Sequence, residues 1–214
     1  MLLSSITPAR LSSTFAASTV SPLILAAVSV IVPLTTATKP TDPTLVSAQA
    51  GTSSVATNAD AYVNSAAPNQ NHGNSSRLIA KASSAEFYLN FTVPQAPSGY
   101  TWSSAKLVVN RPQSDSAGVL TANKVTSSWT EQGVTWNTRP TFQSTQVSIN
   151  DSGTTPSVSI DVTPLLSTGT LGFVVRSGAS TSKAFSSRES GRAANLVLTK
   201  VALPTATSTA TTTA

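Results

Sequence analysis

The segment Glu86–Val93 constrains the fold more strongly than any other part of the chain. Apolar residues alternate with polar or amphipathic ones along its whole length, which is the pattern of a β-strand with one buried face. The expected inward side chains are Phe87, Leu89, Phe91 and Val93, and the outward ones are Glu86, Tyr88, Asn90 and Thr92. Pro94 and Pro97 then end the strand, because proline cannot donate to a strand ladder. The segment therefore predicts one wall of an apolar core between sheets.

Shorter extended segments follow along the chain, and no interval favours a long helix. The expected strands cover residues 60–63, 78–82, 86–93, 105–110, 119–126, 145–150, 158–162, 171–176, 183–188 and 195–201. Thr163-Pro164 predicts one helical turn, with Thr163 as its N-cap. Roughly ten short strands, separated by turn signals about every 8–12 residues, predict an all-β fold, an antiparallel β-sandwich of the jelly-roll kind.

Both flanks of this β-patterned region differ from it in composition. Residues 1–37 contain Arg10 and the apolar stretch 22–34, which is shorter than the roughly 20 residues of a membrane span and indicates an export signal. Residues 38–54 are predicted to be a linker, 55–201 the folded domain, and 202–214 a Thr-rich disordered tail. We therefore expect a secreted, extracellular protein without a stable membrane span after signal cleavage. An uncleaved N-terminal anchor is the alternative.

The charge and the lack of cysteine exclude several kinds of chemistry. With no cysteine, the chain has no disulfide, thiol nucleophile or Cys-based zinc site. Its net charge is +5, and from residue 51 onward eleven basic residues against seven acidic ones leave +4. This excess favours an anionic partner, namely an acidic polysaccharide, a cell wall or nucleic acid, but it does not choose among them.

Two tryptophans lie seven positions apart in the segment Trp129–Pro140. Each indole can bury a large area and needs only one hydrogen-bond acceptor. Val134 and Trp136 have the same parity, so an extended backbone places them on one face. We interpret the segment as a packing plug that closes one end of the sandwich. The alternative is that its indoles form a platform for sugar rings.

Several motifs, taken in order, resemble the secreted DNRLRE-type domain, a family also classed as an alginate-binding carbohydrate-binding module with a jelly-roll fold. They are Asp60-Ala-Tyr-Val63, Asn71-His-Gly73, Tyr88-Leu-Asn-Phe91, Ser104-Ala-Lys-Leu107, Trp129–Pro140, Asp161-Val-Thr163 and Phe185-Ser-Ser-Arg-Glu189. The sequence departs from the family near Glu86, where a basic residue is frequent, and at Thr92, where aspartate is frequent. The resemblance implies a β-sandwich that acts on or near polysaccharides.

The candidate ligand-binding residues are all cationic. They are Arg188, Lys81, Arg77, Lys124, Arg176 and Lys183. The planar fork of Arg188 suits a bidentate contact with a sugar carboxylate. The alternative, which we prefer, is that Arg188 forms a structural ion pair or hydrogen-bond clamp at the rim of the sandwich.

The sequence offers little for catalysis. The single histidine, His72, has no acidic neighbour in the sequence, and no pair of carboxylates is indicated. No cofactor is expected, although Asp60, Asn69, Asn71 and Asn74 would suit a structural calcium ion. We therefore predict a non-catalytic, monomeric module that binds an anionic polysaccharide, such as alginate or another uronate polymer, and not nucleic acid. The alternatives are an adhesive or structural cell-wall domain without a sugar pocket, and a polysaccharide lyase or hydrolase.

Overall fold

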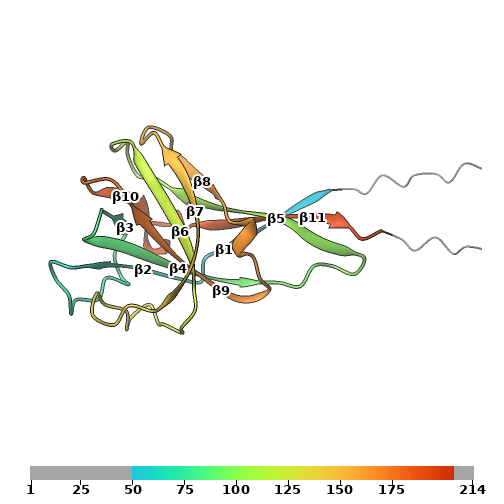
Figure 1. Cartoon of the computed structure of the whole chain (residues 1–214), viewed down its shortest axis with the longest axis horizontal. Helices are drawn as coiled ribbons and strands as arrows, with labels where there is room; N and C mark the ends of the chain where they lie inside the picture. Colours follow the sequence, from blue (N-terminus) through green and yellow to red (C-terminus); the bar gives the residue numbers. More distant parts are fainter. Residues whose placement is uncertain (1–49, 205–214) are drawn as a thin grey trace, which may run out of the picture. The chain divides into compact units, whose positions relative to one another are not determined.

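A computed structural model describes residues 50–204 as a sandwich of two antiparallel sheets (Figure 1). One sheet has the order β1 (Gly51–Ala56), β11 (Asn195–Ala202), β5 (Tyr100–Asn110), β8 (Ser157–Asp161). The other has the order β2 (Ala59–Asn64), β4 (Ala85–Val93), β9 (Gly169–Ser177), β6 (Gly118–Val125), β7 (Phe142–Asp151). A third, two-stranded sheet joins β10 (Lys183–Ser186) to β3 (Arg77–Ala80). The predicted all-β antiparallel sandwich is confirmed, with eleven strands in the described residues.

The core lies between the two main sheets and contains the predicted face of β4. Phe87, Leu89 and Phe91 are fully buried, and Val93 is almost so. Phe91 meets Phe173 of β9 edge to face, with their ring centroids 6.0 Å apart. Burying such side chains contributes about 1.5–3 kcal/mol each, so this strand is a main source of the stability of the sandwich.

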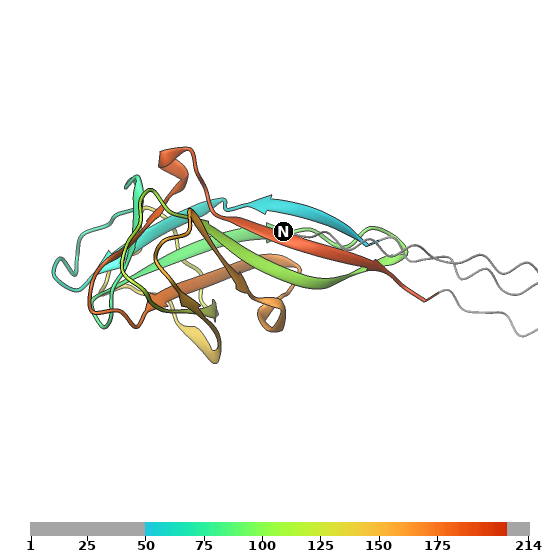
Figure 2. The same cartoon turned by 90° about the horizontal axis from the view of Figure 1, so that it is seen from above.

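The folded region begins earlier than the sequence predicts. The chain joins the sheet at Gly51, so residues 51–54 form part of β1 and are not linker as predicted. Figure 2 shows β1 beside β11, and the two strands pair from Gly51 opposite Lys200 to Ala56 opposite Asn195. Main-chain hydrogen bonds hold this Gly/Thr/Ser-rich edge strand, so it needs little apolar sequence of its own. The proposed signal 1–37 and most of the linker and tail lie outside the described residues.

Two local expectations are corrected. Strand β10 ends at Ser186, and Arg188–Ser190 form a short 3-10 turn, η2, so the predicted alternation does not continue through Arg188. The helical turn after β8 is present as η1 (Thr163–Leu165), but Val162 is its N-cap. The Thr163 hydroxyl instead accepts a hydrogen bond from the main-chain N–H of Ala105 at 3.0 Å, which ties the turn to β5. No helix in the described part of the chain is long and apolar enough to cross a membrane.

Candidate functional site

The loop between β6 and β7, residues 126–141, covers the outer face of the five-stranded sheet. It contains the predicted tryptophan segment, and we call it the Trp loop. Val134, Trp129 and Trp136 pack on a second apolar cluster, separate from the main core, around Tyr88 and Val174. The expectation that the segment packs as a plug is therefore correct, but it covers the face of a sheet and does not close an end of the sandwich. This cover also explains why Tyr88, expected to point outward, is fully buried.

The Asn-rich loop before β3 holds the Trp loop in place. The side-chain amide of Asn71 donates to the main-chain oxygens of Glu131 and Val134, at 2.7 and 2.8 Å. Gly73 packs so closely that a Cβ there would lie 2.3 Å from the Glu131 carbonyl oxygen. A side chain at position 73 would therefore push the two loops apart.

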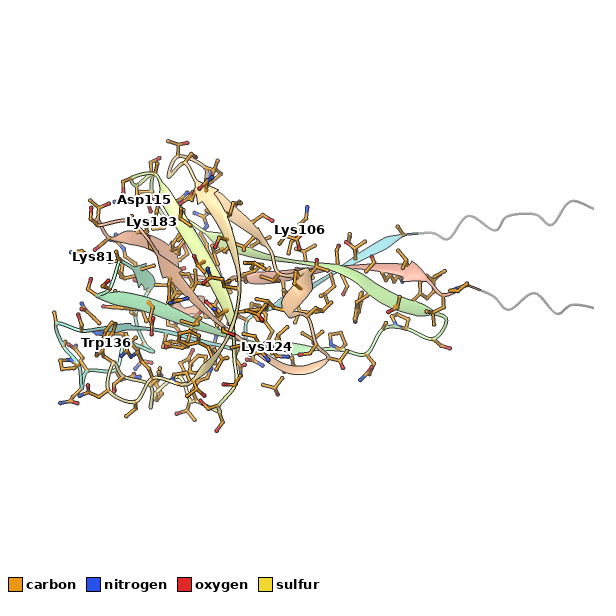
Figure 3. The ribbon with its side chains drawn as sticks, viewed as in Figure 1. Lys81, Lys106, Asp115, Lys124, Trp136 and Lys183 are labelled. Atoms are coloured by element: carbon orange, nitrogen blue, oxygen red, sulfur yellow. The ribbon has the colours of Figure 1, made fainter. Side chains whose placement is uncertain are left out.

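A groove with cationic walls runs along one side of the Trp loop. It consists of two adjoining hollows of about 410 and 500 Å³ that share Glu86, Arg139 and Arg176. Lys81 and Trp136 line the first hollow, and Phe142 lines the second. We call these hollows together the basic groove. In Figure 3, Lys81 and Trp136 lie toward the end of the domain remote from the start of β1 and the end of β11.

Aromatic rings support both arginines of the basic groove. The guanidinium carbon of Arg139 lies 3.7 Å from the centroid of the Trp136 ring system, a close cation–π contact. That of Arg176 lies 4.9 Å from the ring centroid of Phe142, and its Nη2 donates to Asn123 Oδ1 at 2.8 Å. Both cationic groups are thus held by packing before any ligand arrives.

Negative charge in the basic groove is limited to one engaged carboxylate. Glu86 accepts a hydrogen bond of 2.6 Å from the Tyr88 hydroxyl and lies 3.6 Å from Arg139 Nη1. Burial, reinforced by Glu86, raises the pKa of Tyr88, so this tyrosine stays a hydrogen-bond donor. Within residues 50–204, no carboxylate oxygen lies within 4.0 Å of the cationic nitrogens of Lys81 or Arg176. The groove therefore has a net positive lining that suits an anion.

A second groove on the Trp loop carries no charged side chain. Its hollow, of about 420 Å³, is lined by Asn90, Val125, Thr126, Ser127, Ser128, Trp129, Thr170 and Gly172. We call it the neutral groove. One partly exposed indole surrounded by hydroxyl and amide groups is a lining that suits uncharged polar ligands.

Comparison with protein families gives a match to the model of carbohydrate-binding module family 96 over residues 51–200. The chain belongs to this family. The modules of such families are typically non-catalytic, and the chain matches no catalytic family. A comparison with curated proteins gives no match. Among solved structures, the module is similar to an exo-β-1,3-galactanase from Phanerochaete chrysosporium crystallised with galactose, at 12% identity and a TM-score of 0.31, over 69% of this chain and 29% of that longer chain.

Only two of the six candidate residues of this family 96 module line the basic groove, namely Lys81 and Arg176. Arg77 is exposed on β3 with the same outward parity as Lys81, but it does not line either hollow. Lys124 is paired with the core residue Phe173, and its Nζ donates to Ser167 Oγ at 2.8 Å, so it lies on the other face of the sheet from Arg176. Figure 3 shows Lys124 well apart from Lys81.

Lys183 was expected on the binding surface, and this prediction is wrong. Its side chain is fully buried, and its Nζ lies 2.8 Å from Asp151 Oδ2 and 3.0 Å from Asp115 Oδ1. Arg111, also buried, pairs with the same two aspartates. Two cations and two anions thus neutralise each other inside the sandwich, and Lys183 is a structural residue. Figure 3 shows Lys183 beside Asp115.

Arg188 serves as a clamp in the structure, which agrees with the preferred interpretation. Its Nη1 donates to Glu131 Oε1 at 3.1 Å and to the main-chain oxygen of Asn58 at 2.5 Å, so it joins the Trp loop to the start of β2. Its main-chain N–H donates to Asp60 Oδ2 at 2.9 Å. Arg188 lines neither hollow of the basic groove.

Arg139 is the groove residue that the sequence-based prediction missed. It lies three residues after Trp136, in the motif Trp-Asn-Thr-Arg-Pro. The proline that follows, Pro140, is buried, and its ring restricts the backbone at this point. A cation close to an aromatic residue was the available signal, because arginine stacks on indole rings more readily than lysine does.

His72, the residue considered for catalysis, and Asp60 both lie outside the grooves. His72 stacks on Tyr62 with ring centroids 4.1 Å apart, and burial lowers its pKa. Asp60 is the most perturbed carboxyl group: its pKa is raised to about 7, mainly by burial and to a smaller extent by Glu189 and Glu131, against the lowering effect of the hydrogen bond from the Arg188 N–H. Neither residue lines the two grooves, so neither can reach a ligand bound there.

The asparagine side-chain oxygens suggested for calcium have other partners in the structure. Asn69, Asn71 and Asn74 accept hydrogen bonds from Asn137 Nδ2, Gly73 N and Gln132 Nε2, at 2.7, 3.0 and 2.8 Å. These bonds shape the Asn-rich loop and fasten it to the Trp loop. Ordinary loop contacts therefore account for these three asparagines.

Proposed function

We propose that this family 96 module binds an anionic polysaccharide, a uronate polymer of the alginate kind, in the basic groove. The observation that carries the proposal is the set of three cations, Lys81, Arg139 and Arg176, around a groove whose only acidic residue is already engaged. A uronate polymer presents one carboxylate on each sugar ring. A groove with several separated cations matches such a repeat better than it matches a single small anion.

Arg139 and Lys81 are suited to different parts of the recognition. A guanidinium stacked flat on an aromatic ring keeps its N–H edge available for a bidentate contact with a carboxylate. Arg139 occupies one face of Trp136, so that face serves to orient the arginine and not to stack a sugar. Lys81, which is exposed, adds a mobile point charge at the groove wall.

We propose that the module is non-catalytic. Hydrolysis of a glycosidic bond by the usual route needs two carboxyl groups about 5–10 Å apart on either side of the bond. The basic groove offers Glu86 alone, and Tyr88 and Arg139 hold it. The module would then serve outside the cell, as the leader-like residues 1–37 suggest, by attaching itself or a joined protein to the polymer.

Affinity electrophoresis against alginate and pectate, with cellulose and chitin as neutral polymers, tests the proposal. We expect retention by the uronate polymers that weakens as salt is raised, because screening reduces exposed ionic contacts. Arg139→Gln and Arg176→Gln should each weaken retention and reduce its salt dependence. Arg77→Gln is the matched control, since it removes the same charge outside the groove and should leave retention unchanged.

The other outcomes are distinct. Equal weakening by Arg77→Gln, with similar binding to every anionic polymer, would indicate an adhesive surface without a defined site and would contradict the proposal. Salt-independent retention by a neutral polymer would move the site to the neutral groove. Release of reducing ends or unsaturated sugars from alginate would show a hydrolase or lyase.

A further inference from the structure

Three carboxylates converge behind the Trp loop, outside the basic groove. They belong to Asp60 of β2, Glu131 of the Trp loop and Glu189 of η2, and one oxygen from each lies within 4.8 Å of the others. These segments are far apart in the sequence, so the fold itself brings the charges together. Among residues 50–204, one cation joins them, through Arg188 Nη1 at 3.1 Å from Glu131 Oε1. Three carboxyl groups face one guanidinium group here, so acidic groups are in local excess.

Asp60 is the central member of this group and is only 1% exposed. Its Oδ2 accepts the Arg188 N–H, whereas its Oδ1 is buried and no group among the described residues donates to it. Buried carboxylate oxygens are nearly always paired, because leaving one unpaired costs the full loss of its hydration. Glu131 does not relieve Asp60, since its Oε1 accepts the main-chain N–H of Asp60 at 2.8 Å and brings a second negative charge close.

We propose that Asp60, Glu131 and Glu189 form a calcium-binding site that fastens the Trp loop to β2 and η2. Calcium is a hard cation that takes oxygen ligands from irregular, flexible arrangements, completing its shell of about 6–8 ligands with water. Magnesium demands a tighter octahedral shell, and zinc prefers nitrogen and sulfur ligands, which this group lacks. The exposed Glu189 leaves a path for the ion from solvent. By holding Glu131, the bound ion would also hold the Trp loop that carries Trp136 and Arg139.

Thermal melts of the purified chain in calcium and in EDTA test the site. At calcium about 100-fold above its dissociation constant, Tm should rise by roughly 5–10 °C. For the Asp60→Asn variant, whether its Tm lies above or below that of the unaltered chain should depend on calcium. In EDTA this variant should melt at or above the unaltered chain, because its amide oxygen keeps the Arg188 N–H while its NH₂ group can donate to the two glutamates. In calcium it should melt lower and fail to respond to the ion.

Glu189→Gln is the second variant, and because Glu189 is exposed it decides the question even if Asp60→Asn fails to fold. It should reduce the calcium response. Asp161→Asn, which removes one exposed carboxylate elsewhere, should keep the full response. Magnesium should raise Tm much less than calcium. An unaltered chain whose Tm is the same in calcium and EDTA, or a Glu189→Gln variant with the full response, would overturn the proposal. Neither result depends on whether the basic groove binds a uronate polymer.

Discussion

Replacing Lys183 with methionine tests whether this cation is structural or belongs with the cations proposed to bind the polymer. Lys183 is fully buried, and its Nζ contacts Asp151 at 2.8 Å, Asp115 at 3.0 Å and the main-chain oxygen of Ser116. Methionine has nearly the same length and shape, so the substitution removes the charge and the hydrogen bonds without opening a large cavity. Buried Asp151 and partly buried Asp115 would then share Arg111 as their only cation among the described residues.

The expected loss follows from the loss of one partner in a buried ionic group. Removing one partner of such a pair costs about 3–5 kcal/mol, because the remaining charge stays buried. Arg111 still pairs with both aspartates, so we expect the lower end, about 3 kcal/mol, and a fall in Tm of roughly 6–12 °C. Unfolding in urea, followed by circular dichroism, measures the loss; urea carries no charge and therefore does not screen the ion pairs. Binding to alginate at a temperature where the variant is folded should be unchanged.

Lys81→Met is the matched control, since it makes the same chemical change at an exposed position of the basic groove. Its stability should stay within about 0.5 kcal/mol of the unaltered chain, while its affinity for a uronate polymer should fall up to about five-fold. A Lys183→Met variant as stable as Lys81→Met would contradict a structural role for Lys183. The same would follow from a stable Lys183→Met variant that loses binding, because that result would return Lys183 to the ligand surface.

Three further substitutions test the core, the clamp and the response to acid. Phe91→Ala should cost about 3–5 kcal/mol in urea unfolding, and a loss below about 1 kcal/mol would mean that β4 does not bury this face. Arg188→Lys should lower Tm and leave polymer binding intact, since lysine cannot reproduce the contacts of the fork with Glu131 and the main chain; a stable variant with weak binding would instead make Arg188 a ligand contact. Burial alone would raise the pKa of Asp151, but its hydrogen bond from Lys183 and the nearby charges outweigh burial and hold it below the ordinary 3.8. The stability from this carboxylate is therefore present above pH 3.8 and lost as the pH falls through its lower folded-state pKa, and melts of Asp151→Asn across that range should lack this loss.

The sequence predicts the parts of the fold that depend on burying apolar side chains in a regular pattern. Strand β4 is such a part, because its alternation leaves one arrangement that buries Phe87, Leu89 and Phe91 together. Strand β1 is not predicted, because main-chain pairing with β11 holds its polar residues in place. Its side chains therefore show no apolar alternation that would indicate a strand. Tyr88 shows a second limit, because alternation tells which residues share a face but not whether a distant loop covers that face.

The sequence predicts the sign of the charge at the candidate site, but it does not predict which cationic residues line the site. A positive net charge favours an anionic ligand, yet the net charge does not distinguish an exposed cation from a buried, paired one. Lys183 and Lys81 are the same residue type, and only the positions of Asp115 and Asp151, 68 and 32 residues away in the sequence, make one of them structural. Such long-range pairing of charges depends on the register of strands and loops, which no local pattern specifies.

In the Trp loop, packing and the proposed ligand binding depend on the same side chain. Trp136 packs on the apolar cluster around Tyr88, and its ring also supports the guanidinium of Arg139. The two functions first considered as alternatives for this indole, structural plug and binding platform, are therefore compatible, because the platform carries an arginine in place of a sugar. The Arg139 side chain then loses its conformational entropy when the domain folds and not when the polymer binds. Such preorganisation increases affinity. If so, a contact that holds the backbone beside Trp136, such as the bond from the Asn71 amide to the Val134 carbonyl oxygen, affects polymer binding without touching the polymer.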